Sequence, residues 1–159
     1  QERPEDAAKH YAALSTLAAD PVMETLTVWD RYPLSHAAHI AERTVSAELA
    51  LARGDHRTAI AALREAVLIE DEIPYDEPPG WHAPVRQTLG VVLLAANQPT
   101  EAEAVYREEL RRNPSNGWSL RGLAESLRAQ KRDDEAAEAE QQLAAAWANA
   151  DVQPVASRI

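Results

Sequence analysis

Residues 85–114, VRQTLGVVLLAANQPTEAEAVYREELRRNP, decide the fold, because their pattern recurs in residues 120–143, LRGLAESLRAQKRDDEAAEAEQQL. Four positions match at one constant separation: Leu89 with Leu123, Gly90 with Ala124, Leu93 with Leu127, and Ala102 with Ala136. A small residue beside a leucine lets two helices of a hairpin cross closely, and the later alanine faces the same contact from the second helix. The repeat therefore predicts an array of helical hairpins that stack on one another.

This pattern resembles the tetratricopeptide repeat family, whose period is about 34 residues and whose signature is W-x2-L-G-x2-Y, then A-x3-F, then P. Residues 83–116 fit it with Arg86 at the Trp position, Leu93 at the Tyr position and Tyr106 at the Phe position. Residues 117–150 fit less closely, with Leu120 for the Trp and Glu140 where an aromatic is expected. A degenerate unit spans 40–73, where six positions remain in register: Ala47, Gly54, Asp55, Ala59, Leu63 and Ala66. The resemblance implies an all-α fold, a tetratricopeptide-type α-solenoid of about seven to eight helices, with three units within residues 34–150.

An insertion at 72–84 is predicted between the first two units. Ala59 and Ala102 occupy the same repeat position but lie farther apart in the sequence than one repeat period. The four prolines of the insertion forbid a continuous helix, and its composition differs from that of a flexible Gly/Ser linker. We therefore expect an ordered cover folded across the junction between the first two repeat units, with Tyr75 and Trp81 packed on it.

The two acids of the insertion, Asp76 and Glu77, have a structural and a catalytic interpretation. In the structural one they cap a turn, and Arg86 or a free helix N-terminus holds one of them. In the catalytic one, a carboxylate buried beside aromatics has a raised pKa and acts in acid–base chemistry. The structural interpretation is favoured.

The N-terminal region, residues 1–33, reads as an orphan repeat helix followed by a short extra helix. Ala7, Tyr11 and Leu14 have the spacing of a second repeat helix over residues 4–18, but no first helix precedes them. Residues 75–90 and 101–123 also resemble the C-terminal region of longer bacterial tetratricopeptide proteins of unassigned activity. We therefore expect a C-terminal segment of a larger protein, and self-association through the N-terminal helix remains open. Residues 151–159 form a tail.

Composition excludes several functional classes. The net charge of −10 and the pI near 4.9 disfavour nucleic-acid binding, and no apolar run is long enough to span a membrane. The absence of cysteine excludes disulfides and thiolate metal sites and is compatible with a cytoplasmic location. No nucleophile elbow, phosphate loop or dinucleotide fingerprint occurs. The five histidines form no convincing ligand set, although His36 and His39 share a helix spacing. We expect no enzyme activity, no catalytic residue, no cofactor and no metal.

Candidate binding residues follow from the family resemblance. In this family the first helices line a concave groove, and four positions of each repeat point into it. Those positions here are Thr44, Glu48, Gln87, Val91, Trp118, Arg121, Glu125 and Arg128. Trp118 with Arg121 and Arg128 on one helix face would suit a carboxylate or an acidic peptide. In the competing interpretation Trp118 belongs to the core and the arginines pair with neighbouring acids.

The sequence thus favours a non-catalytic protein–protein interaction scaffold. The alternative is a small-molecule or metal-binding module that contributes to an enzyme or a sensor completed by further N-terminal repeats.

Overall fold

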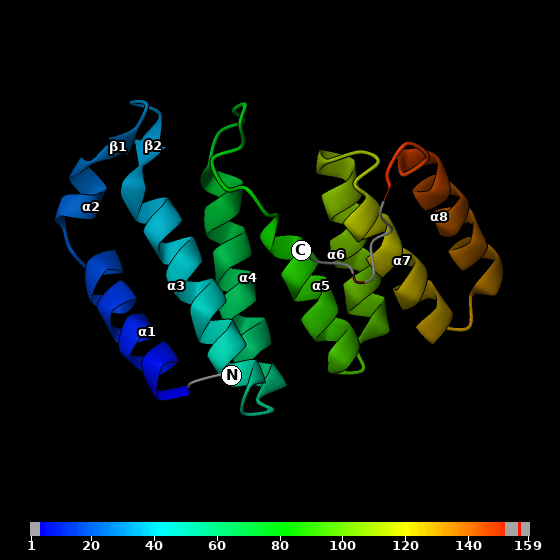
Figure 1. The fold of residues 1–159 in the computed structure, drawn as a ribbon, viewed down its shortest axis with the longest axis horizontal. Helices are drawn as coiled ribbons and strands as arrows, with labels where there is room; N and C mark the ends of the chain where they lie inside the picture. Colours follow the sequence, from blue (N-terminus) through cyan, green and yellow to red (C-terminus); the bar gives the residue numbers. More distant parts are fainter. Residues whose placement is uncertain (1–3, 152–155, 157–159) are drawn as a thin grey trace. The chain divides into compact units, whose positions relative to one another are not determined.

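The computed structural model describes residues 4–151 and residue 156, and the side chains from residue 7 onward. The chain divides into two compact units, residues 1–85 and 86–159, and each is described by itself. Within the described residues there are eight helices and one two-stranded sheet, so the all-α prediction is confirmed (Figure 1).

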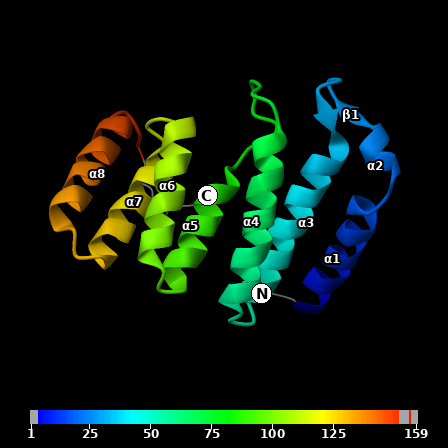
Figure 2. The ribbon, with the colours of Figure 1, turned by 180° about the vertical axis from the view of Figure 1, so that it is seen from behind.

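The first unit contains three long helices, one short helix and a β-hairpin. Its elements are α1 (Pro4–Ala18), α2 (Val22–Thr25), β1 (Thr27–Val28), β2 (Tyr32–Pro33), α3 (Leu34–Leu51) and α4 (His56–Glu72). Helices α3 and α4 form an antiparallel hairpin, and α1 lies along α3 in both ribbon views (Figures 1 and 2). At the turn before α4, Gly54 adopts φ 76° and Asp55 accepts a hydrogen bond from the Thr58 backbone N–H at 3.0 Å.

The short helix expected after the orphan helix is only partly present. Helix α2 ends after four residues, and the chain then forms an antiparallel hairpin in which Val28 pairs with Tyr32. Trp29 and Asp30 form the hairpin turn with φ of 50° and 57°. Two consecutive residues with positive φ are what a type I′ hairpin turn requires, although neither of them is a glycine.

Helix α1 is held on α3 by a buried carboxylate as well as by apolar contacts. Glu42 of α3 is 6% exposed, and it accepts hydrogen bonds from Tyr11 Oη at 2.6 Å and Ser15 Oγ at 3.2 Å. Arg43 pairs with the same carboxylate at 3.0 Å. Ala18, Met23 and Ala38 form a small apolar cluster beside this network. The orphan helix is therefore covered in part by its own chain.

The second unit contains four helices, α5 (Val85–Ala95), α6 (Pro99–Arg112), α7 (Gly117–Ala129) and α8 (Asp133–Ala146). The boundary between the units falls after Val85, the first residue of α5. The Tyr106 side chain is fully buried at the centre of this unit. A Cβ on Gly90 would lie 2.2 Å from the Tyr106 ring, and a Cβ on Gly122 would lie 2.1 Å from it. The ring of α6 is thus enclosed by glycines of α5 and α7, which lets these helices approach closely.

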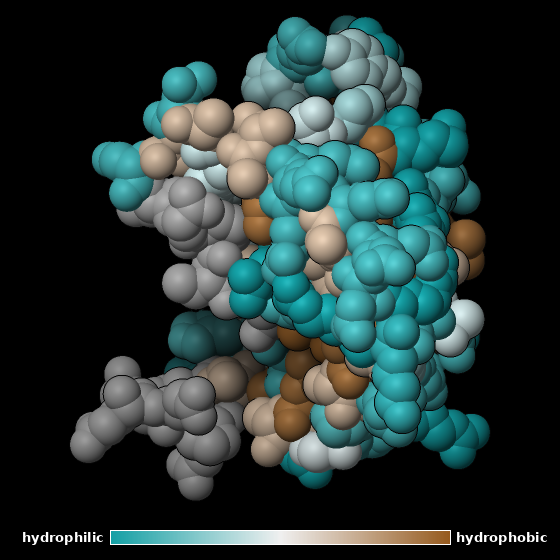
Figure 3. Space-filling view, turned by 90° about the vertical axis from the view of Figure 1, so that its right-hand side faces the viewer, coloured by the Kyte–Doolittle hydropathy of each residue, from teal (hydrophilic) through white to brown (hydrophobic). Residues whose placement is uncertain are grey.

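The positions that match between the two repeats are buried, as stacked hairpins require. Leu93, Ala102 and Ala124 are fully buried, and Leu127 is 1% exposed. In contrast, the face over α8 is mostly hydrophilic (Figure 3), because that helix begins with Asp133, Asp134 and Glu135. Such a polar end is what a terminal hairpin of an array needs.

Candidate interaction surfaces

The predicted groove residues of α7 share one partly exposed face, which we call the α7 face: Trp118, Arg121, Glu125 and Arg128. Asn116 starts this helix, since its side chain accepts hydrogen bonds from the backbone N–H groups of Trp118 and Ser119. The helix then places residues three, seven and ten positions after Trp118 on the same side. Both arginines have carboxylate partners within this unit.

Arg121 Nε lies 2.6 Å from Glu125 Oε1, and both side chains are 36% exposed. Arg128 pairs with Glu140, the residue of α8 that stands where the repeat pattern expects an aromatic. At this position an ion pair therefore takes the place of the expected aromatic contact. The α7 face therefore presents two neutralised arginines in partly exposed pairs, which contribute little to stability.

Trp118 is partly buried and packs edge-to-face against Trp147, with ring centroids 4.9 Å apart. Trp147 follows α8 and lies over Gly117, where a Cβ would come within 1.8 Å of its ring. Trp118 therefore combines the two interpretations offered by the sequence, since one part of the indole is packed and another remains accessible.

The other predicted groove residues differ in exposure. Glu48 is exposed and Val91 is half-buried, whereas Gln87 is only 2% exposed. Thr44 donates its hydroxyl to the Ile40 carbonyl at 2.8 Å, which satisfies that side chain within α3. Gln87 is thus unsuited to contact a ligand in this conformation.

The insertion residues also depart from expectation. Tyr75 is 80% exposed, so the prediction that it packs as part of a cover is wrong, whereas Trp81 is half-buried beside His82. Asp76 pairs with Arg31 at 3.5 Å rather than with Arg86. The acid at the N-terminus of α5 is Glu70, which accepts a hydrogen bond from the Val85 N–H at 3.2 Å. The physical reason is that the β-hairpin, which the sequence did not indicate, offers nearer partners.

Arg86 is buried in the second unit, where its positive charge acts on Glu109. Glu109 is 1% exposed, and its Oε1 accepts a hydrogen bond from Asn113 Nδ2 at 2.8 Å. Burial raises the pKa of Glu109, and the charge of Arg86 partly opposes that shift. A carboxylate so enclosed has a perturbed pKa but no access to a substrate.

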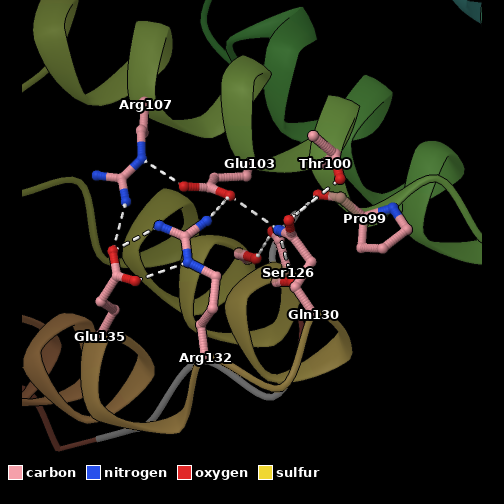
Figure 4. A network of polar contacts seen from close by, with 9 residues as sticks. Pro99, Thr100, Glu103, Arg107, Ser126, Gln130, Arg132 and Glu135 are labelled. Atoms are coloured by element: carbon pink, nitrogen blue, oxygen red, sulfur yellow. Dashed lines mark hydrogen bonds and ion pairs between the residues drawn. The ribbon is translucent and has the colours of Figure 1, made fainter.

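A polar network centred on Glu103 was not anticipated from the sequence (Figure 4). The Glu103 carboxylate accepts from Arg107 at 2.8 Å, Gln130 at 2.8 Å and Arg132 at 2.5 Å, which joins α6 to the turn before α8. Burial disfavours its ionised form, but the hydrogen bonds from Arg107 and Gln130 hold its pKa below the usual range. Because all these charges are mutually satisfied, the network stabilises the stack of hairpins. The i, i+4 spacing of Glu103 and Arg107 was the sequence feature that could have predicted the ion pair between them.

Two of the hollows on the described surface bear on function. One, of about 500 Å³, is formed by α6, α7 and α8 of the second unit, and its lining is mainly apolar. Its residues are Leu110, Pro114, Ser115, Leu120, Gln142, Ala145 and Ala146. The other, of about 330 Å³, belongs to the first unit and is lined by residues of the β1–β2 hairpin and of the loop after α4.

Two further features of the described residues bear on function. Among the described residues, no group of three or more His, Cys, Asp or Glu side chains is arranged to hold a metal ion. No helix in the described part of the chain has the length and hydropathy needed to cross a membrane.

Comparison with known proteins supports the architecture. Residues 88–151 match the model of a family described as tetratricopeptide repeat. The solved structure titled "Crystal structure of MamA protein" is similar, with a TM-score of 0.55 and 12% sequence identity, covering 76% of this chain and 68% of that chain. No curated protein matches the sequence. At this level of identity the structural likeness concerns the fold alone.

Proposed function

Since the chain carries tetratricopeptide repeats, we propose that it is a non-catalytic scaffold whose α7 face binds an acidic segment of a partner protein. Stacked helical hairpins present extended surfaces that suit protein binding. We also propose that the hairpins α3–α4, α5–α6 and α7–α8 are its three repeat units.

The proposal rests on one observation: the packed Trp118 ring lies on the same helix face as two arginines whose ion pairs are partly exposed. Trp147 holds the Trp118 ring at one angle, so little side-chain entropy is lost when a partner packs on it. The pairs Arg121–Glu125 and Arg128–Glu140 are partly exposed. Because such pairs are worth only about 0–1 kcal/mol, an incoming carboxylate can replace Glu125 or Glu140 at small cost.

The surroundings of the described acids are compatible with the non-catalytic part of the proposal. Among the described acids, Glu109 combines a raised pKa with burial, and its enclosure by Asn113 and Arg86 leaves no approach for a substrate. Glu125 of the α7 face and Glu140 of α8 are each engaged in an ion pair with an arginine.

The alternative, a small-molecule module, has one supporting observation. The hollow of about 500 Å³ in the second unit lies within the size range of small-ligand sites, about 300–1,000 Å³. It offers few polar groups to orient a ligand, chiefly Gln142 and Ser115. The scaffold function is therefore preferred.

A peptide titration tests the proposal. The probe is an N-acetylated Gly-Asp-Glu-Asp peptide with a free C-terminal carboxylate, and binding is followed by isothermal titration calorimetry at low salt. We expect Arg121→Ala and Arg128→Ala each to weaken binding by about tenfold or more, as charge-assisted hydrogen bonds of roughly 1.5–3 kcal/mol imply.

The matched control is Arg111→Ala on α6. Arg111 is also an exposed arginine in an intrahelical ion pair, with Glu108, and its loss changes the net charge equally. If Arg111→Ala weakens binding as much as Arg121→Ala, the peptide responds only to net charge and the α7 face is not the site.

Self-association through the N-terminal region is a separate proposal. Leu17, Val22 and Leu26 are each nearly half exposed, which leaves apolar surface at the α1–α2 end of the first unit. Sedimentation velocity over a hundredfold concentration range tests it, and a concentration-independent monomer would contradict it.

A further inference from the structure

The β1–β2 hairpin and the loop after α4 project from the same end of the first unit, at the top of both ribbon views (Figures 1 and 2). They enclose a hollow of about 330 Å³. Its lining residues, which define the tip hollow, are Trp29, Arg31, Asp76, Glu77 and Pro78. Neither the groove prediction nor the repeat pattern accounts for this feature.

Three contacts hold together these two loops, which are far apart in the sequence. Arg31 Nη2 donates to the Tyr75 carbonyl at 2.9 Å, and Arg31 Nε lies 3.5 Å from Asp76 Oδ2. Gly80 lies against the buried Tyr32, because a Cβ at Gly80 would come within 2.3 Å of the Tyr32 hydroxyl. The hollow is thus formed before any ligand arrives, which reduces the entropy lost on binding.

The aromatic component of the tip hollow is Trp29. It is 63% exposed at the hairpin turn, and no aromatic partner is recorded for it in the described part of the chain. An exposed indole offers a π face to which cations are attracted more strongly than to Tyr or Phe. Apolar groups would also contact such a face, so the charges around it decide the ligand class.

The charges of the tip favour a cation. Asp30, Asp76 and Glu77 supply three carboxylates against the single guanidinium of Arg31. Arg31 is engaged with Asp76 and the Tyr75 carbonyl, so its charge is already compensated. Glu77 accepts a hydrogen bond from the Tyr75 hydroxyl. A carboxylate has about four acceptor positions, so capacity for a further donor remains.

We propose that the tip hollow binds a lysine or arginine side chain from a basic segment of a partner protein. The cation lies over the Trp29 indole, and its N–H groups donate to Glu77. A hollow of about 330 Å³ is at the lower end of ligand-site sizes, which fits one long side chain rather than a large cofactor. This inference goes beyond the α7 face, because the two surfaces belong to different units and select opposite charges.

The experiment titrates the ¹⁵N-labelled full chain with N-acetylated, C-amidated peptides and observes indole N–H signals by NMR. The probes are Gly-Arg-Gly-Arg-Gly and the same peptide with citrulline, which keeps the shape of arginine without its charge. A third probe is Nα-acetylarginine amide, which tests whether a free small molecule binds as well as a peptide. The Trp29 signal is identified by its loss in Trp29→Asn, a change that the positive φ of the turn tolerates.

Glu77→Gln and Glu138→Gln form the matched pair of variants. Both change the net charge equally, but Glu138 is an exposed acid on α8. We expect the arginine peptide to shift the Trp29 signal, and the citrulline peptide to bind at least threefold more weakly. Glu77→Gln should raise the Kd about two- to fivefold, the range of an exposed cation–π or ion-pair contact. Glu138→Gln should leave the Kd unchanged.

Four outcomes overturn the proposal. They are an unshifted Trp29 signal, equal binding of the citrulline peptide, equal effects of Glu77→Gln and Glu138→Gln, and binding of acetylarginine amide as tight as that of the peptide. Circular dichroism of each variant shows whether the fold is retained, and the citrulline comparison needs no variant. Because none of these probes is acidic, failure here leaves the acidic-peptide test of the α7 face unaffected.

Discussion

Gly122→Ala tests the packing that holds the second unit together. A methyl group at position 122 would lie 2.1 Å from the Tyr106 ring. The ring cannot retreat, because on its other side the Cβ position of Gly90 is 2.2 Å away and the side chain is fully buried. We therefore expect the helices to be forced apart rather than the ring to rotate.

The magnitude follows from two opposed effects. Overpacking a dense core costs about 1–3 kcal/mol, whereas replacing Gly by Ala within a helix gains up to about 1 kcal/mol. The net expectation is a loss of about 1–2 kcal/mol in the free energy of unfolding. For a chain of this size that lowers the Tm by about 2–8 °C.

The assay is urea and thermal unfolding followed by far-UV circular dichroism, with Gly122→Ala measured alone and in a Tyr106→Leu background. Removing the ring removes the clash, so in that background the alanine should be neutral or stabilising. Gly54→Ala is the control. Gly54 has no atom within 4 Å of its Cβ position and a φ of 76°, so its cost is conformational and independent of Tyr106. A stabilising Gly122→Ala, or the same cost in both backgrounds, would refute the packing argument.

Three further predictions concern buried and exposed polar groups. Ser119→Ala should stabilise the chain by about 1 kcal/mol, because Ser119 Oγ is buried and has no hydrogen-bond partner among the described residues. Ser126→Ala should destabilise the chain, because it removes a 2.5 Å hydrogen bond to the Gly122 carbonyl. Denaturant titrations of both variants measure these changes in the free energy of unfolding. Burial raises the pKa of Glu109, so the protonated carboxyl suits the folded chain better than the ionised one does. The stability that Glu109 contributes is therefore fully present below the pKa of this group in the unfolded chain, and it is lost as pH rises through the higher pKa in the folded chain. Glu109→Gln should therefore be least harmful at pH 7 and relatively more harmful near pH 4, and a pH-independent difference would contradict this. Hydrogen bonds from Arg111 lower the pKa of Glu108 to about 2. The stability that the ionised Glu108 contributes should therefore be lost as pH falls from about 4.5 towards 2. In Glu108→Gln the free energy of unfolding should fall less steeply over the same pH range.

Local chemistry and periodicity made much of the fold predictable. The repeat period places Leu89, Leu123 and their companions on the inner sides of successive helices, and burial of those side chains follows from helix geometry alone. The prolines of the insertion fixed where α4 had to end and where α5 could begin. The ion pairs at short spacing, such as Arg121 with Glu125, were equally accessible, because helix geometry brings residues four apart together.

The surfaces depended instead on pairings that no local pattern encodes. Arg31 contacts Tyr75 and Asp76, which lie in a distant part of the sequence. Because of this contact, the insertion that was expected to cover the repeat junction lines the tip hollow instead. Trp118 of α7 meets Trp147, which follows α8, and Arg128 meets Glu140 between the same two helices. Each of these contacts exists only after helices have stacked, since the free energy that selects the partner comes from burial and charge in the assembled unit. The sequence by itself therefore determined the long helices and the repeat positions that pack between them, while the tertiary structure alone decided the β1–β2 hairpin and which exposed side chains stand together as surfaces for binding.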